Sequence, residues 1–183
     1  TARYYTPTGR SIQKPYTKNG DSNYRKDYQK RIQSGELLSK DSIQVADSLR
    51  YVTPKGKVVY GGGGIIPDVF VGIDTTAYLS NFYFRSINNF SFDYVDENRK
   101  EITKKWTLET FIEDFDKDEK VLDEYFSKIK EISKPSFTTR EKIRKYLKAS
   151  IANDLFGDVG FYRIIHQDDK MLQKVLELDS NLE

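Results

Sequence analysis

Glycine and proline lie almost entirely in the first 73 residues, and this uneven distribution constrains the fold more than any other feature. Nine of the eleven glycines and four of the five prolines precede residue 74. After that point apolar residues recur with the 3.6-residue spacing of helices. The sequence therefore predicts an α+β chain, with a small β-strand element in residues 1–74 and a mostly α-helical region in residues 75–183.

The first region is predicted to contain short strands joined by turns. Residues 47–62 predict a hairpin, because β-branched and aromatic residues flank the turn Thr53-Pro54-Lys55-Gly56. A further strand is expected over residues 67–73, with a proline at its first position, where the missing N–H costs no ladder bond. Residues 2–5 are also strand-forming. A charged insertion over residues 18–50 separates these segments.

The charged insertion has one predicted helix of its own. Its residues 18–36 are polar, and Asp21 or Ser22 is a suitable cap for a short exposed helix. Gly35 is expected to end that helix, since glycine accepts the left-handed conformation found after a last helical turn.

The second region predicts helices that pack on one another. Thr138 and Glu141 have the spacing of a capping box, and Asp168 or Asp169 is expected to begin the last helix. Apolar residues at helical spacing are expected to face inward. They are Leu79, Phe82, Tyr83, Ile87, Phe90, Val121, Leu122, Tyr125, Phe126, Ile129, Ile132, Ile143, Leu147, Ile151, Leu155, Met171, Leu172, Val175 and Leu176.

Composition excludes several kinds of chemistry. There is no cysteine, so disulfides and thiol catalysis are excluded, and His166 is the only histidine, so no histidine cluster can hold zinc. His166 and Trp106 are expected to make structural contacts. The net charge of +2 does not indicate a nucleic-acid partner, and no apolar run approaches the roughly 20 residues that cross a bilayer.

Ser11 and Lys14 match the S-x-x-K spacing of some serine acyl enzymes. In such enzymes the two side chains lie one helical turn apart, so that the amine can accept the hydroxyl proton. Pro15 disfavours helical backbone at Lys14. A polar loop is therefore the expected structure, and an acyl enzyme is the alternative.

The four consecutive glycines at 61–64 could bind an anion through backbone amides. They lack the Lys-Ser/Thr of a P-loop, and the following residues predict extended rather than helical chain. We expect these glycines to allow positive φ or the close passage of another backbone. Ligand contact is the alternative.

Acidic residues at 114, 116 and 118 resemble the start of a calcium-binding loop. The sixth and twelfth positions of that loop hold Glu119 and Tyr125, where glycine and glutamate are required. Acidic capping of a helix is the expected role. The residues of this chain predict no metal site and no cofactor.

Two stretches in order, TARYYTPTGRSIQ at 1–13 and GGGGIIPDVFV at 61–71, resemble the C-terminal processing, or tail-specific, serine proteases. That family carries T-P-x-G-x-S-I-Q and, downstream, G-[IV]-x-P-D-[IV]-x-V. The long insertion and the ending at 157–178 resemble its Bacteroidetes branch. The matching residues are Tyr5, Pro7, Gly9, Ser11, Ile12, Gln13, Gly64, Ile65, Pro67 and Asp68.

The resemblance implies a crotonase-like α/β protease with an attached PDZ domain, a serine nucleophile and a lysine general base. In the family both catalytic residues precede the first motif, so none is expected among these 183 residues. Residues 1–74 would then be the end of the protease core, and the matching residues would have structural roles or border the cleft. A polypeptide substrate, bound through the upstream protease and PDZ segments, and a location in the cell envelope or periplasm are also implied.

The first residues, TARYY, include no initiator methionine, and we expect the chain to be a piece of a longer protein that is inactive in isolation. Strand edges left without neighbours are expected to promote self-association. One rival hypothesis treats residues 75–183 as a non-catalytic helical interaction or assembly module. The other is an acyl enzyme that uses Ser11 and Lys14.

Overall fold

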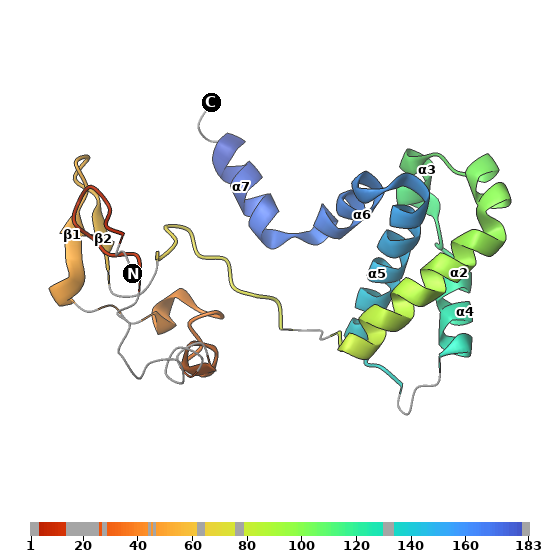
Figure 1. The fold of residues 1–183 in the computed structure, drawn as a ribbon, viewed down its shortest axis with the longest axis horizontal. Helices are drawn as coiled ribbons and strands as arrows, with labels where there is room; N and C mark the ends of the chain where they lie inside the picture. Colours follow the sequence, from red (N-terminus) through yellow and green to blue (C-terminus); the bar gives the residue numbers. More distant parts are fainter. Residues whose placement is uncertain are drawn as a thin grey trace. The chain divides into compact units, whose positions relative to one another are not determined.

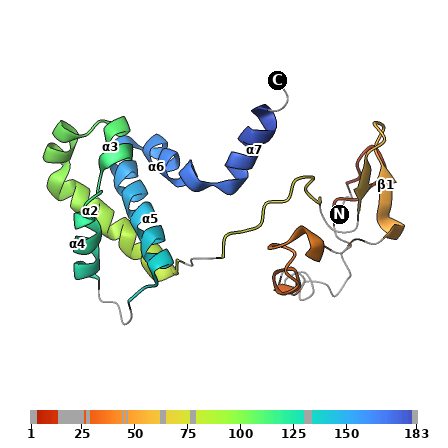
Figure 2. The same ribbon diagram turned by 180° about the vertical axis from the view of Figure 1, so that it is seen from behind.

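The computed structural model describes residues 4–13, 26, 29–43, 45, 47–61, 65–75, 79–129 and 134–180. They belong to two compact units, Thr1–Ile73 and Asp74–Glu183, called here the N-terminal and C-terminal units (Figures 1 and 2). In the described residues the N-terminal unit holds a two-stranded antiparallel sheet, and the C-terminal unit is helical. The predicted α+β class is confirmed.

The predicted hairpin is present. Strand β1 (Arg50–Val52) pairs with β2 (Val58–Tyr60), and Tyr51 lies opposite Val59. The short 3-10 helix η2 (Asp47–Leu49) leads directly into β1. An isolated pair of two strands is marginally stable in water, so this sheet needs further contacts to persist.

Two turns in the N-terminal unit share one sequence pattern and one set of hydrogen bonds. In the hairpin, the Gly56 amide donates to the Thr53 carbonyl oxygen at 2.8 Å, and the Thr53 amide donates to Lys57 at 2.8 Å. In residues 6–10, the Gly9 amide donates to the Thr6 carbonyl oxygen at 2.8 Å, and the Thr6 amide donates to Arg10 at 2.9 Å. Both glycines have φ of 79°. The pattern T-P-x-G-[RK] therefore encodes the same turn twice, because proline presets φ at the second position and glycine accepts the left-handed fourth.

The remainder of the N-terminal unit is irregular. Residues 29–33 are helical and Gly35 follows with φ of 82°, which confirms the predicted stop, whereas Asp21 and Ser22 lie outside the described residues. A 3-10 helix, η1 (Lys40–Ser42), comes next. The strand predicted over residues 67–73 is wrong. Among the described residues this segment makes one backbone bond, from the Ile73 amide to the Leu37 carbonyl oxygen, where a strand needs a continuous ladder.

The C-terminal unit contains six described helices. They are α2 (Asn81–Lys105), α3 (Leu108–Asp114), α4 (Lys120–Lys128), α5 (Phe137–Phe156), α6 (Asp158–Ile165) and α7 (Lys170–Ser180), with the 3-10 helix η3 (His166–Asp168) before the last. Helix α5 packs against α2 and α6, and α3 contacts both α5 and α6 (Figures 1 and 2).

Aromatic and branched side chains from α2 to α6 form the core. Phe111, Leu122, Tyr125, Ile143 and Ile151 are fully buried. The inward stripes predicted for the first helices are confirmed at most positions, but Phe82 is 47% exposed. Ile132 lies outside the described residues.

Helix α5 begins two residues earlier than its predicted capping box. The Ser136 hydroxyl accepts a hydrogen bond from the Thr139 amide at 3.2 Å, so Ser136 is the cap and Thr138 lies inside the helix. The physical reason is that Ser136 directly follows Pro135, which cannot continue a helix, and places a hydroxyl one residue before the first helical position. At its other end α5 stops at Gly157, whose φ is 73°.

Helix α7 begins as predicted but faces solvent. The Asp169 carboxylate accepts from the amides of Met171 and Leu172 at 2.9 and 3.0 Å. The predicted inward side chains of this helix are wrong, since Met171 and Val175 are 61% and 60% exposed. Leu172 and Leu176 are exposed too, and no residue of α7 is buried.

Candidate functional site

The first protease-like motif folds as a small turn. Tyr5 and Ser11 form an isolated antiparallel bridge across it, and Pro7 and Gly9 occupy the turn itself. The Ser11 hydroxyl donates to the carbonyl oxygen of Gln13 at 3.1 Å and is exposed to solvent. Residues 11–13 are not helical, so the described part of the S-x-x-K stretch lacks the geometry of an acyl enzyme, and Lys14 lies outside the described residues.

The described part of the second motif, residues 65–71, is irregular, bends at residues 68–69 and has no buried residue. Ile65 is 67% exposed, Pro67 and Asp68 are exposed as well, and Gly64 lies outside the described residues. The Asp68 carboxylate pairs with the Lys57 amine at 2.5 Å. Lys57 ends the hairpin turn, so this ion pair joins the second motif to the hairpin.

Arg10 joins the first motif to the same hairpin. Its Nη1 donates to the Tyr60 carbonyl oxygen at 3.2 Å, at the end of β2. A Cβ atom on Gly61 would lie 3.1 Å from the Tyr51 ring and 3.2 Å from Cγ of Arg10. The two nearest atoms to this Cβ position belong to side chains, and the Leu49 carbonyl oxygen follows at 3.8 Å. The sequence did not indicate a role for Arg10.

The described apolar side chains of the N-terminal unit are at most partly covered. None of its described residues is buried, and the buried hydrophobic residues of the described chain all lie at Leu79 or beyond. Tyr4, Tyr5 and Ile65 are each more than half exposed. Burial of apolar area is the main favourable term in folding, and the described residues of the motif-bearing unit contribute little of it.

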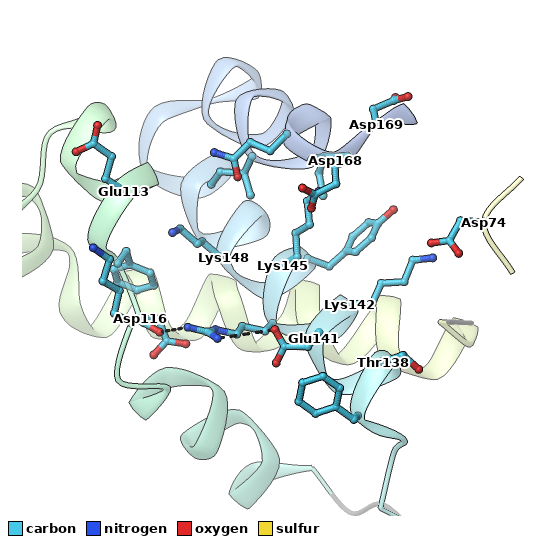
Figure 3. A pocket seen from close by; sticks show the side chains of 18 residues that line it. Asp74, Glu113, Asp116, Thr138, Glu141, Lys142, Lys145, Lys148, Asp168 and Asp169 are labelled. Atoms are coloured by element: carbon cyan, nitrogen blue, oxygen red, sulfur yellow. Dashed lines mark hydrogen bonds and ion pairs between the residues drawn. The ribbon is translucent and has the colours of Figure 1, made fainter. Parts of the chain in front are cut away.

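The C-terminal unit has a cavity of about 700 Å³ beside α5 (Figure 3). Its wall carries both signs of charge. At one edge the Lys145 amine pairs with the Asp168 carboxylate at 2.7 Å. Deeper in the wall, the Lys148 amine donates to the Ile112 carbonyl oxygen at 2.7 Å.

Three basic side chains spaced four residues apart on α5 hold α3 and the acidic turn that follows it. Arg140 pairs with Glu119 at 3.1 Å, and Arg144 donates to the Asp116 carbonyl oxygen at 3.0 Å. Lys148 completes the row through its bond to the end of α3. This row, called here the basic ladder, neutralises the turn and fastens it to α5.

The acidic turn caps α4, as predicted. Oδ1 of Asp116 accepts from the Val121 amide at 2.9 Å, and Asp116 and Glu119 both have positive φ. Burial raises the pKa of the Asp116 carboxyl, against the opposing effects of the Val121 amide and Arg144. Burial lowers the pKa of the Lys148 amine, and the nearby positive charge of Arg144 lowers this pKa further.

His166 and Trp106 have the structural contacts expected of them. The imidazole lies 5.3 Å from the Tyr162 ring at the end of α6, and the indole lies edge-on to Phe111 and Phe115. Within the described residues no three His, Asp or Glu side chains are grouped so that they could hold a metal ion. No described helix combines the length and apolarity required to cross a bilayer.

Comparison with known proteins finds one family model, which matches the middle of the chain and assigns no activity. The sequence model of a family of unknown function (DUF8443) matches residues 78–157, which is less than half of the chain and extends from just before α2 to the end of α5. No curated protein and no solved structure matches the chain.

Proposed function

We propose that the chain is the C-terminal part of a carboxyl-terminal processing serine endopeptidase, with the serine nucleophile and lysine base in the segment that precedes Thr1. The ordered pair of motifs at 1–13 and 61–71 suggests this class. The N-terminal unit would be the closing β element of a crotonase-like core, and the parent enzyme would act on polypeptides in the cell envelope.

One structural observation supports the proposal more than any other: the motif-bearing unit has no buried residue among those described. A hairpin with exposed Val52 and Val58, and neighbouring exposed tyrosines, is expected where a larger sheet supplies the missing cover. The two motifs converge on this hairpin through Arg10 and Asp68. A segment that closes a larger core would have both properties.

The experiment uses the parent protein with its upstream segment. A fluorophosphonate probe is expected to label one serine that precedes Thr1, and replacing that serine by alanine should abolish both labelling and peptide cleavage. The 183-residue chain by itself should neither react with the probe nor cleave peptides.

Ser11→Ala in the parent is the matched control. Its hydroxyl only donates to Gln13, so this variant should be labelled at the normal rate. Loss of labelling in Ser11→Ala would support the acyl enzyme that uses Ser11. A parent that has no reactive serine upstream would leave the helical interaction module as the better hypothesis.

A further inference from the structure

We infer that Arg10 is a positioning residue, which clamps the first protease-like motif onto the hairpin and thereby fixes the start of the glycine run. This inference rests on the proposed function for its catalytic consequence, but the clamp itself is a property of this chain. The residue follows the T-P-x-G turn and lies 51 positions before Gly61.

The clamp has two parts. The guanidinium Nη1 donates to the Tyr60 carbonyl oxygen at 3.2 Å, and the aliphatic stem lies beside Gly61. Arginine can do both because its apolar stem packs while its planar head donates. The backbone of Arg10 is also held by its own turn, because the Arg10 amide donates a hydrogen bond to the Thr6 hydroxyl at 3.2 Å.

Gly61 is the residue against which the Arg10 stem lies. Its amide donates to the Leu49 carbonyl oxygen at 2.8 Å, which extends the hairpin pairing by one residue beyond β2. With the Tyr51 ring and the Arg10 stem both within 3.2 Å of the Cβ position, a side chain here would push one of them away. Arg10 and Gly61 are therefore complementary, and the position of the first glycine of the run depends on both.

The second T-P-x-G turn shows what is special about the first. It carries Lys57 at the position equivalent to Arg10, and that lysine pairs with Asp68 at the surface. Arg10 instead reaches across about 50 residues of sequence to the backbone at Tyr60. The two equivalent basic residues thus attach the hairpin to different motifs, and only the arginine contacts backbone next to the glycine run.

The catalytic consequence follows if the glycine run borders the cleft of the parent protease. A displacement of about 1 Å in a supporting segment can reduce turnover roughly a hundredfold. Loss of the clamp should then lower kcat and leave KM nearly unchanged, because the substrate is bound mainly by the upstream segments. Global stability should change little, because the clamp lies outside the helical core.

The first arm of the test uses the parent protein with its upstream segment and measures amide hydrogen exchange at Gly61. Arg10→Met keeps the stem and removes the donors, and should speed exchange at Gly61 about tenfold. Arg10→Lys keeps one donor and should give a smaller increase, whereas Ser11→Ala should leave the rate unchanged. Unchanged exchange in Arg10→Met, or an equal increase in Ser11→Ala, would overturn the clamp.

The second arm uses the parent enzyme and a fixed peptide substrate. Arg10→Met should lower kcat at least about tenfold with KM within about twofold, and Arg10→Lys should restore part of the loss. A normal kcat in Arg10→Met would refute the positioning role while leaving the protease assignment intact. A parent without peptidase activity would refute the proposed function, and the exchange arm would still decide whether the clamp exists.

Discussion

Replacing Gly160 by alanine sets helix propensity against packing, and the structure predicts which effect is larger. Gly160 is buried inside α6. In an open helical position, exchanging glycine for alanine stabilises by about 1 kcal/mol. Here the new Cβ would lie 2.7 Å from the carbonyl oxygen of Ala152 and 3.2 Å from its Cβ, so α6 would have to move away from α5.

The magnitude follows from these distances. The contacting atom at 2.7 Å belongs to the backbone of a helix, so it cannot rotate away as a side chain would. Overpacking of this kind costs about 1–3 kcal/mol, and a rigid neighbour favours the upper part of that range. After subtraction of the propensity gain, Gly160→Ala should destabilise the chain by about 2 kcal/mol.

Thermal unfolding followed by circular dichroism at the helix band measures this effect. In a unit of this size, about 2 kcal/mol corresponds to a melting temperature lower by roughly 8 °C. Val159→Ala is the control in the same helix, because Val159 is 61% exposed and its loss should change stability by less than about 0.5 kcal/mol. A rise in melting temperature for Gly160→Ala would refute the close packing of α6 on α5.

Three further substitutions test other parts of the C-terminal unit. Burial raises the pKa of the Asp154 carboxyl in the folded chain, so the folded state binds this proton more readily than the unfolded state. The associated stability is present at low pH and is lost as the pH rises through the folded-state pKa. Asp154→Asn should therefore raise the urea midpoint at pH 7 but not at pH about 3, which lies below the ordinary pKa of an aspartate. Gly157→Ala should destabilise by about 1–3 kcal/mol in thermal unfolding through backbone strain alone, because φ there is 73° and no atom lies within 4 Å of the new Cβ. Arg144→Met should cost about 2 kcal/mol in urea unfolding through loss of its charged hydrogen bond to Asp116, whereas Lys174→Met, which loses an exposed pair with Glu177, should cost less than about 0.5 kcal/mol.

Local chemistry made part of this fold predictable. The hairpin over residues 50–60 follows from a turn pattern that specifies φ at each position, and the stop at Gly35 follows from the same rule. The stripe on α5 was readable because Ile143, Leu147 and Ile151 recur at helical spacing and are buried. In each case the signal lies within a few residues of the structure it specifies.

The incorrect predictions share a dependence on partners distant in sequence. Residues 67–73 have strand-forming composition, yet a strand exists only where another strand completes its ladder. The apolar residues of α7 have helical spacing, but periodicity does not say whether anything covers them, and Val175 is 60% exposed. The clamp by Arg10 was missed for the same reason, since nothing near residue 10 indicates contact with Tyr60. The signal that could have revealed it is the repetition of T-P-x-G followed by a basic residue.

The buried residues and the two sequence motifs lie in different units of the chain, and the proposed substitutions should affect the two units separately. The C-terminal unit contains the buried residues and the basic ladder, so Gly160→Ala and Arg144→Met should change unfolding and leave amide exchange at Gly61 unaltered. The N-terminal unit has both motifs and no buried residue among those described, so Arg10→Met should do the reverse. A double variant of Arg10→Met and Gly160→Ala should show both effects, faster exchange at Gly61 and a lower melting temperature, because the two residues lie in separate compact units.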